Sequence, residues 1–199
     1  MPKRYSAYFS LICLLLVHPA SFADFPQTKL HFTMLPPYCL AQMRPHWAPP
    51  GDPNKWSKKL GSGFAHLHHY CAALHSLRLA QEIAGINKKQ KETRLSKLRE
   101  VMTNIQYMED KAEPSFVLFS HIYTTKAEAL FELGHPNDAV DSLNMAIERN
   151  KRFPKPYRLL ADYYIKQGKQ NEARDILQEG LKHSPDSKIL MKKLQKIGK

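Results

Sequence analysis

The chain has 199 residues, of which 43% are apolar, and it carries a formal net charge of +12 at pH 7. This length suits one ordinary domain, and the apolar content excludes wholesale disorder because it is high enough for a packed core. The basic residues are spread along the chain, and no arginine-rich stretch interleaves with aromatics. The charge therefore favours anionic partners such as acidic protein segments, and we expect no nucleic-acid site.

Residues 1–23 have the pattern of an export signal. Lys3 and Arg4 precede the apolar run 7–17, and Ser21-Phe22-Ala23 places small residues at the two positions that a signal peptidase reads. We expect cleavage before Asp24 and a periplasmic or secreted protein. An uncleaved membrane anchor is the alternative, but the run has only about 11 residues, whereas a spanning helix needs roughly 20. No later segment is long and apolar enough, so no transmembrane span is expected after cleavage.

Residues 24–62 hold seven of the fourteen prolines of the chain. Proline at this density removes backbone donors and fixes φ, so no long helix is expected there. The segment also carries large apolar side chains that a disordered linker rarely has: Phe25, Phe32, Leu35, Tyr38, Trp47 and Trp56. The prediction is a proline-rich extended arm that lies along a helical body.

Cys39 and Cys71 are the two cysteines that remain after removal of the signal. In an oxidising compartment a lone pair is most simply a disulfide, which here would close a loop of 32 residues (71 − 39) and attach the arm to the body. The spacing alone does not show that the two sulfurs meet.

A helical hairpin is predicted over residues 63–114. The first helix shows three-four spacing of its apolar stripe, and Gly85 is expected to follow its end. The second helix carries one apolar face, and Pro114 marks the break after it. The two stripes are Phe64, Leu67, Tyr70, Cys71, Leu74 and Leu77, then Leu95, Leu98, Met102, Ile105 and Met108.

Residues 115–185 contain one pattern twice, with a period of 34 residues. Gly134, Asn137, Asp138 and Ala139 recur as Gly168, Asn171, Glu172 and Ala173, and four further pairs match: Tyr123 with Tyr157, Ala127 with Ala161, Leu143 with Leu177, and Ile147 with Leu181. We expect helices over 115–133, 137–151, 155–167 and 171–183, and a basic capping helix over 187–197 within the last segment, 186–199.

A glycine turn followed by an acidic-alanine step at this period resembles the tetratricopeptide repeat (TPR). The resemblance is tight over 115–185 and loose over 63–199, so the hairpin 63–114 would be a degenerate repeat or a cap. Departures are mild: Tyr123 and Tyr157 replace a tryptophan, Gly180 replaces an alanine and Lys151 a proline. The resemblance implies an all-α fold, a short TPR-like solenoid of antiparallel helix pairs with the proline-rich arm at its N-terminal end.

The order of two further motifs also resembles small exported bacterial TPR proteins of unassigned function. These motifs are Leu35-Pro36-Pro37-Tyr38-Cys39 and His68-His69-Tyr70-Cys71, and both precede the repeats. This second resemblance strengthens the pairing of Cys39 with Cys71 and implies no chemistry.

The TPR resemblance also implies a peptide-binding groove on the inner face of the first helix of each repeat. Its positions here are His121, Thr124, Glu128, Phe131, Lys155, Arg158, Asp162 and Ile165. Lys155 and Arg158 lie on one helical face and could hold a carboxylate, although two solvated charges are the simpler interpretation. The asparagine-rich clamp of repeats that bind chaperone C-termini is missing, which disfavours that ligand class.

The densest reactive cluster is His66–His75. On a helix, His68, Cys71 and His75 share a face and could ligate zinc or copper. A disulfide would consume Cys71, however, and the pattern matches no recognised ligand motif. The favoured interpretation is structural, with no metal, and the metal site is kept as the alternative.

The sequence contains no motif of an enzyme: no phosphate-binding glycine loop, no His-Glu-x-x-His, no Gly-x-Ser-x-Gly and no Cys-x-x-Cys. We expect no catalysis and no cofactor. The favoured hypothesis is an exported TPR scaffold or adaptor that binds a protein or peptide segment in the bacterial envelope. The alternatives are a periplasmic metal-binding protein that uses His66–His75, and a surface binder of an anionic envelope polymer.

Overall fold

The computed structural model describes residues 25–197 and is all-α over that range. Its helices are α1 (Lys29–Thr33), α2 (Pro37–Met43), α3 (Asp52–Leu60), a 3-10 helix (Gly61–His66), α4 (Leu67–Glu82), α5 (Lys88–Lys111), α6 (Phe119–Leu133), α7 (Pro136–Arg149), α8 (Pro154–Lys166), α9 (Gln170–His183) and α10 (Lys188–Ile197). The expected signal peptide, 1–23, lies outside the described residues. None of the helices between residues 25 and 197 combines the length and apolar character that crossing a membrane requires.

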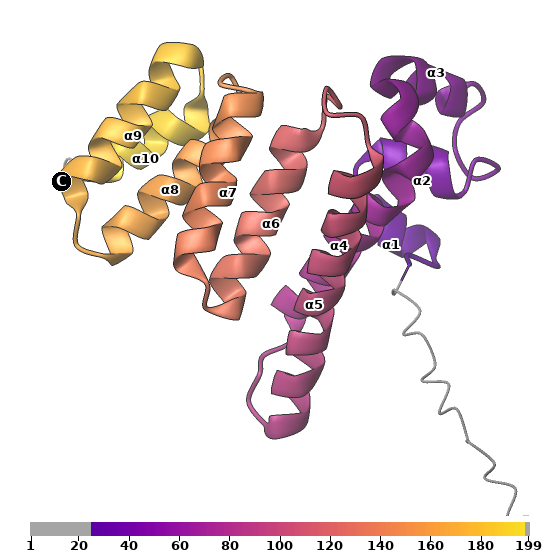
Figure 1. Cartoon of the computed structure of the whole chain (residues 1–199), viewed down its shortest axis with the longest axis horizontal. Helices are drawn as coiled ribbons and strands as arrows, with labels where there is room; N and C mark the ends of the chain where they lie inside the picture. The colour runs from indigo at the N-terminus through magenta and orange to yellow at the C-terminus, as the bar shows by residue number, and fades with distance from the viewer. Residues whose placement is uncertain (1–24, 198–199) are drawn as a thin grey trace, which may run out of the picture.

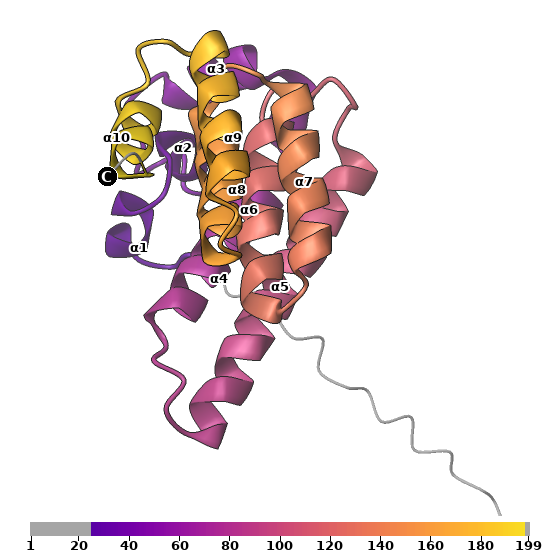
Figure 2. The ribbon, with the colours of Figure 1, turned by 90° about the vertical axis from the view of Figure 1, so that its left-hand side faces the viewer.

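Successive helices pack in antiparallel pairs. Helix α4 packs against α5, α6 against α7, and α8 against α9, and each pair contacts the next. The pairs follow one another in chain order across the molecule (Figure 1). Figure 2 shows α1, α2 and α10 on one side of the pairs and α5 and α7 on the other. The expectation of a short solenoid of helix pairs is therefore confirmed.

The two 34-residue repeats end their first helices in the same way. Gly134 and Gly168 both adopt left-handed backbone, with φ of 82° and 75°. A side chain at either position would be strained, which is why glycine recurs there. The following amides, of His135 and Lys169, each donate to a carbonyl five residues earlier at 2.9 Å. The residues that share the register therefore have the same backbone role.

Small residues in the register allow the repeat helices to approach closely. Ala127, Ala139, Ala161 and Ala173 are all completely buried, as the register predicts for the contact between paired helices. The aromatic pair of the register, Tyr123 and Tyr157, is buried as well. At these register positions the side chains of the two repeats are thus equally buried.

The N-terminal segment differs from its prediction. It is not extended: α1, α2, α3 and the 3-10 helix occupy most of 29–66. Proline occupies the first turn of α2 and of α3, where its missing N–H would have had no intrahelical acceptor. The prolines therefore limit these helices to between five and nine residues without preventing them.

Aromatic side chains fix the N-terminal segment in place. Phe32 packs edge-on against Trp47 and Tyr38 edge-on against Trp56, with ring centroids 6.1 and 5.7 Å apart. Phe32 and Tyr38 are buried in the same core cluster as residues of α4 and α5. Burial raises the pKa of the Tyr38 phenol above its ordinary value, so this ring remains neutral.

The first hairpin has its own boundaries and contact face. Helix α4 ends at Glu82, and Gly85 lies in the loop after it with φ of 69°. Of the predicted stripe on α5, Leu95 is 39% exposed, whereas Val101, which the stripe omitted, is fully buried. The contact face of α5 is therefore shifted toward its C-terminal half.

Helix α10 closes the C-terminal end of the solenoid. It packs on α8 and α9, and Leu190 is its buried residue. Its opposite face is exposed and lysine-rich, as a cap requires.

Candidate partner-binding groove

A hollow of about 590 Å³ lies on the face formed by the first helices of successive pairs. Helices α4, α6 and α8 and the turn before α7 contribute its lining: Gln81, Glu128, Phe131, Glu132, Gly134, Pro136, Leu159, Asp162, Tyr163, Lys166 and Gln167. The rings of Phe131 and Tyr163 lie 5.5 Å apart and supply its aromatic surface. This is the face on which the groove was predicted.

Three of the eight predicted groove residues line this hollow, namely Glu128, Phe131 and Asp162. Two others are structural. Thr124 is only 1% exposed and donates to the Ser120 carbonyl at 2.6 Å, and Ile165 packs in the core of the second repeat.

His121 lies beside the helix junction, outside the hollow. Its ring stacks on Phe153, the residue before α8, with centroids 4.2 Å apart. Burial lowers the pKa of His121, and the positive charge of Lys155 lowers it further. A neutral imidazole is thus favoured at this position.

Lys155 and Arg158 are both paired with carboxylates of the chain. Lys155 Nζ lies 2.8 Å from Glu128 Oε2, and Arg158 Nη1 lies 2.7 Å from Asp162 Oδ2. Asp162 also forms an ion pair with Lys193 of α10, with 2.5 Å between Lys193 Nζ and Asp162 Oδ1. A carboxylate of a partner would therefore have to compete with two carboxylates of the chain. Binding of such a group by Lys155 and Arg158 is thus less favourable than the sequence alone indicates.

Tyr163 and Lys166 line the hollow but were not predicted to do so. In the 34-residue register Tyr163 corresponds to Ala129, so the repeat itself gives no signal for an aromatic there. Lys166 is exposed, and none of the carboxylates among residues 25–197 lies within ion-pair distance of it. It is therefore a better candidate than Lys155 for contact with an acidic group.

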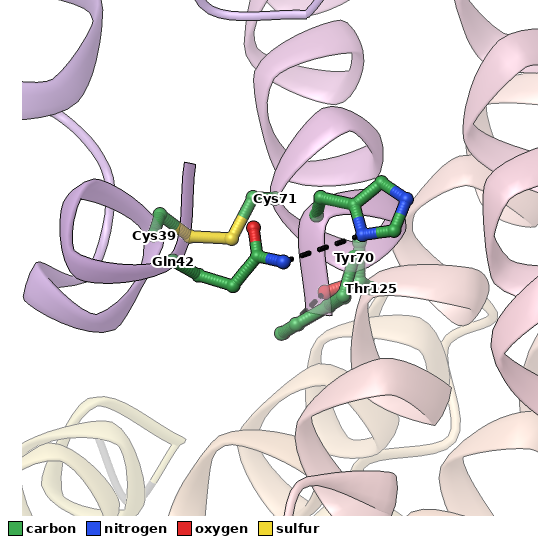
Figure 3. The surroundings of a disulfide bond; sticks show 6 residues. Cys39, Gln42, Tyr70, Cys71 and Thr125 are labelled. Carbon is green, nitrogen blue, oxygen red and sulfur yellow. Dashed lines mark hydrogen bonds between the residues drawn. A yellow bond between two sulfur atoms is a disulfide. The ribbon is translucent and has the colours of Figure 1, made fainter. Parts of the chain in front are cut away.

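The disulfide prediction agrees with the structure. Cys39 of α2 and Cys71 of α4 are bonded, with their Cα atoms 5.6 Å apart, and both are completely buried. Figure 3 shows the bond together with the side chain of Gln42, which reaches toward α4. In the same view Tyr70 meets Thr125 of α6, with 3.2 Å between their hydroxyl oxygens. The disulfide thus attaches the N-terminal segment to the helix that also contacts the first repeat.

The metal alternative loses one of its three ligands. Because the Cys71 sulfur is bonded to Cys39, it offers no thiolate to join His68 and His75. Over the part of the chain that the structure describes, no group of three histidine, cysteine or acidic side chains could hold a metal ion.

The histidines of the cluster have other contacts. His68 Nδ1 lies 3.4 Å from Gln42 Nε2, and His69 Nδ1 lies 2.8 Å from Asn104 Oδ1. The His75 ring lies 4.6 Å from that of His31 in α1. Burial lowers the pKa of His68, and the neighbouring His69 adds to this shift. These contacts join α4 to the N-terminal segment and to α5.

Comparison with models of protein families gives a match for the C-terminal part of the chain. Residues 130–196 match the family model described as tetratricopeptide repeat. Together with the equivalent glycine caps and buried alanines, this match shows that residues 130–196 are built of tetratricopeptide repeats, as the register predicted.

Two further comparisons are less informative. No curated protein matches the chain. Among solved structures, the chain is similar to the first TPR of Spaghetti (RPAP3) bound to the HSP90 peptide SRMEEVD, with 21% sequence identity and a TM-score of 0.44 over 63% of this chain and 92% of that one. Nothing about the ligand of this chain follows from that similarity.

Proposed function

We propose that this chain is an exported scaffold that binds an extended segment of a partner protein in the hollow between α6 and α8. The observation that carries the proposal is the aromatic hollow at Phe131 and Tyr163, which lies on the inner face of a TPR solenoid. Repeat scaffolds of this kind bind along such concave surfaces. The pattern of residues 1–23 and the buried pair Cys39–Cys71 support export to an oxidising compartment.

The lining of the hollow favours a particular kind of segment. Phe131, Leu159 and Tyr163 offer apolar surface to one side chain of the partner, whereas the nearby carboxylates are already paired with cations of the chain. Lys166 at the rim has no such partner among the described residues and is available for an acidic group. The proposed ligand is therefore an apolar residue beside an acidic one in an extended peptide.

Site-specific photocrosslinking in the native cell tests this function. A photoreactive residue at Gln167, which lines the hollow, should capture one partner, whereas the same residue at Gln178, on the exposed face of α9, should not. Tyr163→Ser and Lys166→Glu should each abolish the product at Gln167 while leaving the helical content unchanged. Equal crosslinking from both positions, or a product that survives both substitutions, would reject the groove.

Export is tested separately. The N-terminal sequence of protein isolated from its own cells should begin at Asp24, and the protein should fractionate outside the cytosol. A chain that retains residues 1–23 inside the cytosol would contradict the export part of the proposal and leave the groove test unaffected.

A further inference from the structure

The loop between α4 and α5 and the first turns of α5 form the most projecting part of the molecule. We call residues 83–95 the hairpin tip. In Figures 1 and 2 the tip extends beyond the ends of all the other helices drawn in colour. A flat surface could therefore touch the tip without meeting the rest of the solenoid.

The tip and the next turn of α5 are strongly basic. Residues 83–99 carry six cations against one carboxylate, Glu92: Lys88, Lys89, Lys91, Arg94, Lys97 and Arg99. Lys89 and Lys91 are exposed, and no carboxylate of residues 25–197 lies within ion-pair distance of either. These two charges are unused within the chain.

Lys89 and Lys91 do not serve the helix in which they lie, whereas Lys88 pairs with Glu92 one turn later. The first turn of α5 has no acidic residue, although the N-terminal end of a helix favours negative charge. Asn87 and Gln90 cap the helix reciprocally and leave the lysines out of the cap. Helix stability therefore does not explain why these lysines lie at this end of α5. Their position is consistent with binding of an external anion.

An exposed apolar side chain accompanies this charge. Ile86, next to Gly85 in the loop, is 81% exposed and is the most exposed of the large hydrophobic residues that the structure describes. A soluble polyanion would make little use of an isoleucine at this position. A lipid surface would bury it among acyl chains below the headgroups, and this transfer is favourable in proportion to the apolar area removed from water.

Two basic side chains of the tip pass close to Gly85. An added Cβ on Gly85 would lie 3.9 Å from Lys91 Cγ and 4.0 Å from Arg94 Nη1. Together with Leu95 these residues line a shallow hollow of about 290 Å³. Glu132 holds Arg94 through Nη2 at 2.8 Å, which fixes the guanidinium and leaves its Nη1 without an acceptor among the described residues.

We infer that the hairpin tip docks the protein on a membrane surface that contains anionic phospholipid. Ile86 enters the interface, a headgroup phosphate lies between Lys91 and Arg94, and Lys89 contacts a neighbouring headgroup. The combination of a projecting apolar residue with unpaired cations is what a lipid interface recognises. Glu132 also lines the partner-binding hollow, so a docked tip would hold that hollow near the membrane. The inference does not depend on the occupant of the hollow.

Vesicle co-sedimentation of the protein purified from its own cells tests the docking. The wild type should bind mixed phosphatidylcholine–phosphatidylglycerol vesicles more strongly than pure phosphatidylcholine, and the difference is the readout. Lys89→Gln/Lys91→Gln should lower the partition constant on the mixed vesicles roughly 10–30-fold, because each interfacial cation contributes several-fold. Ile86→Ser should lower it several-fold without changing the net charge.

The matched control removes the same charge elsewhere. Lys192→Gln/Lys196→Gln changes two exposed lysines of α10, at the opposite end of the solenoid, and should leave vesicle binding within about twofold of wild type. Equal losses in the two double variants would show a general charge effect and overturn the inference. Wild-type binding by Ile86→Ser, or stronger competition by soluble heparin than by anionic vesicles, would overturn it as well.

Discussion

Gly180 of α9 lies directly against the Tyr157 ring of α8. A Cβ added to Gly180 would lie 2.8 Å from Tyr157 Cγ and 3.1 Å from Tyr157 Cβ, and 2.8 Å from a terminal methyl group of Leu190. Ala146 occupies the equivalent position 34 residues earlier and is fully buried. The glycine, which departs from the usual alanine of the family, therefore makes room for the aromatic ring and for the capping helix together.

Gly180→Ala should lower the free energy of unfolding by up to about 2 kcal/mol. Overpacking in a core typically costs about 1–3 kcal/mol, and the higher helix propensity of alanine returns up to about 1 kcal/mol. The base of the Tyr157 ring cannot move aside as easily as the end of a flexible side chain. Urea denaturation measures the effect, with Gln178→Ala on the exposed face of α9 as a control that should stay within about 0.5 kcal/mol of wild type. A stabilised Gly180→Ala protein would contradict the tight contact.

The register predicted the C-terminal fold well because TPR packing is local. Each glycine cap and each small residue acts within one pair of helices, so the 34-residue period contains the necessary information. The expected helix 137–151 is observed as Pro136–Arg149, and 171–183 as Gln170–His183. The start of α5 was harder to predict from the sequence, because it depends on the reciprocal cap between Asn87 and Gln90.

The N-terminal segment shows where proline counting fails. Density of proline correctly excludes a long helix, but the position of each proline decides whether a short helix can start. Pro37 lies at the start of α2 and Pro53 in the first turn of α3, where proline is tolerated. An extended arm was therefore the wrong expectation, although the attachment through Cys39 was correct.

The candidate site was predicted only in part because it depends on contacts between helices. The register placed Phe131 and Asp162 on the face where the hollow lies. It could not show that Tyr163 approaches Phe131, or that Lys193 from α10 reaches Asp162. Such pairings follow from the angle between successive repeats, and one repeat alone does not determine that angle.

Loss of the disulfide should destabilise the protein substantially. For a loop of 32 residues the chain-entropy model gives roughly 3.5–4 kcal/mol, and both sulfurs lie in the main core cluster. Cys39→Ala/Cys71→Ala should therefore unfold at a clearly lower urea concentration than wild type under oxidising conditions. Addition of a reductant should lower the midpoint of the wild type and leave that of the double variant unchanged. An equal response of both proteins to the reductant would show that the bond is not formed in solution.

Stability should fall in mild acid through His121. Burial and Lys155 depress its pKa in the folded state, so below the ordinary histidine pKa of about 6.5 the unfolded chain binds more protons than the folded one. The contribution of the neutral ring is therefore fully present above that pH and is lost as the pH falls toward the depressed value. His121→Phe keeps the stacking on Phe153 and cannot be protonated. Between about pH 7.5 and about pH 5, a range that spans the ordinary histidine pKa, its melting temperature should therefore fall less than that of the wild type. His46→Gln, which changes an exposed histidine, is the control and should keep the wild-type slope.

The ion pair between Lys155 and Glu128 should contribute a measurable but small coupling. Their side chains are 40% and 19% exposed, so solvent screens the pair only in part, and a coupling of about 0.3–1 kcal/mol is expected at low salt. A double-mutant cycle with Lys155→Met and Glu128→Gln, followed by urea denaturation, measures it. The exposed pair Lys182–Glu179 provides the comparison, and its coupling should be close to zero. A coupling at Lys155 no larger than at Lys182 would mean that Lys155 exchanges its internal partner easily. Glu128 would then not compete with a carboxylate of a ligand for Lys155.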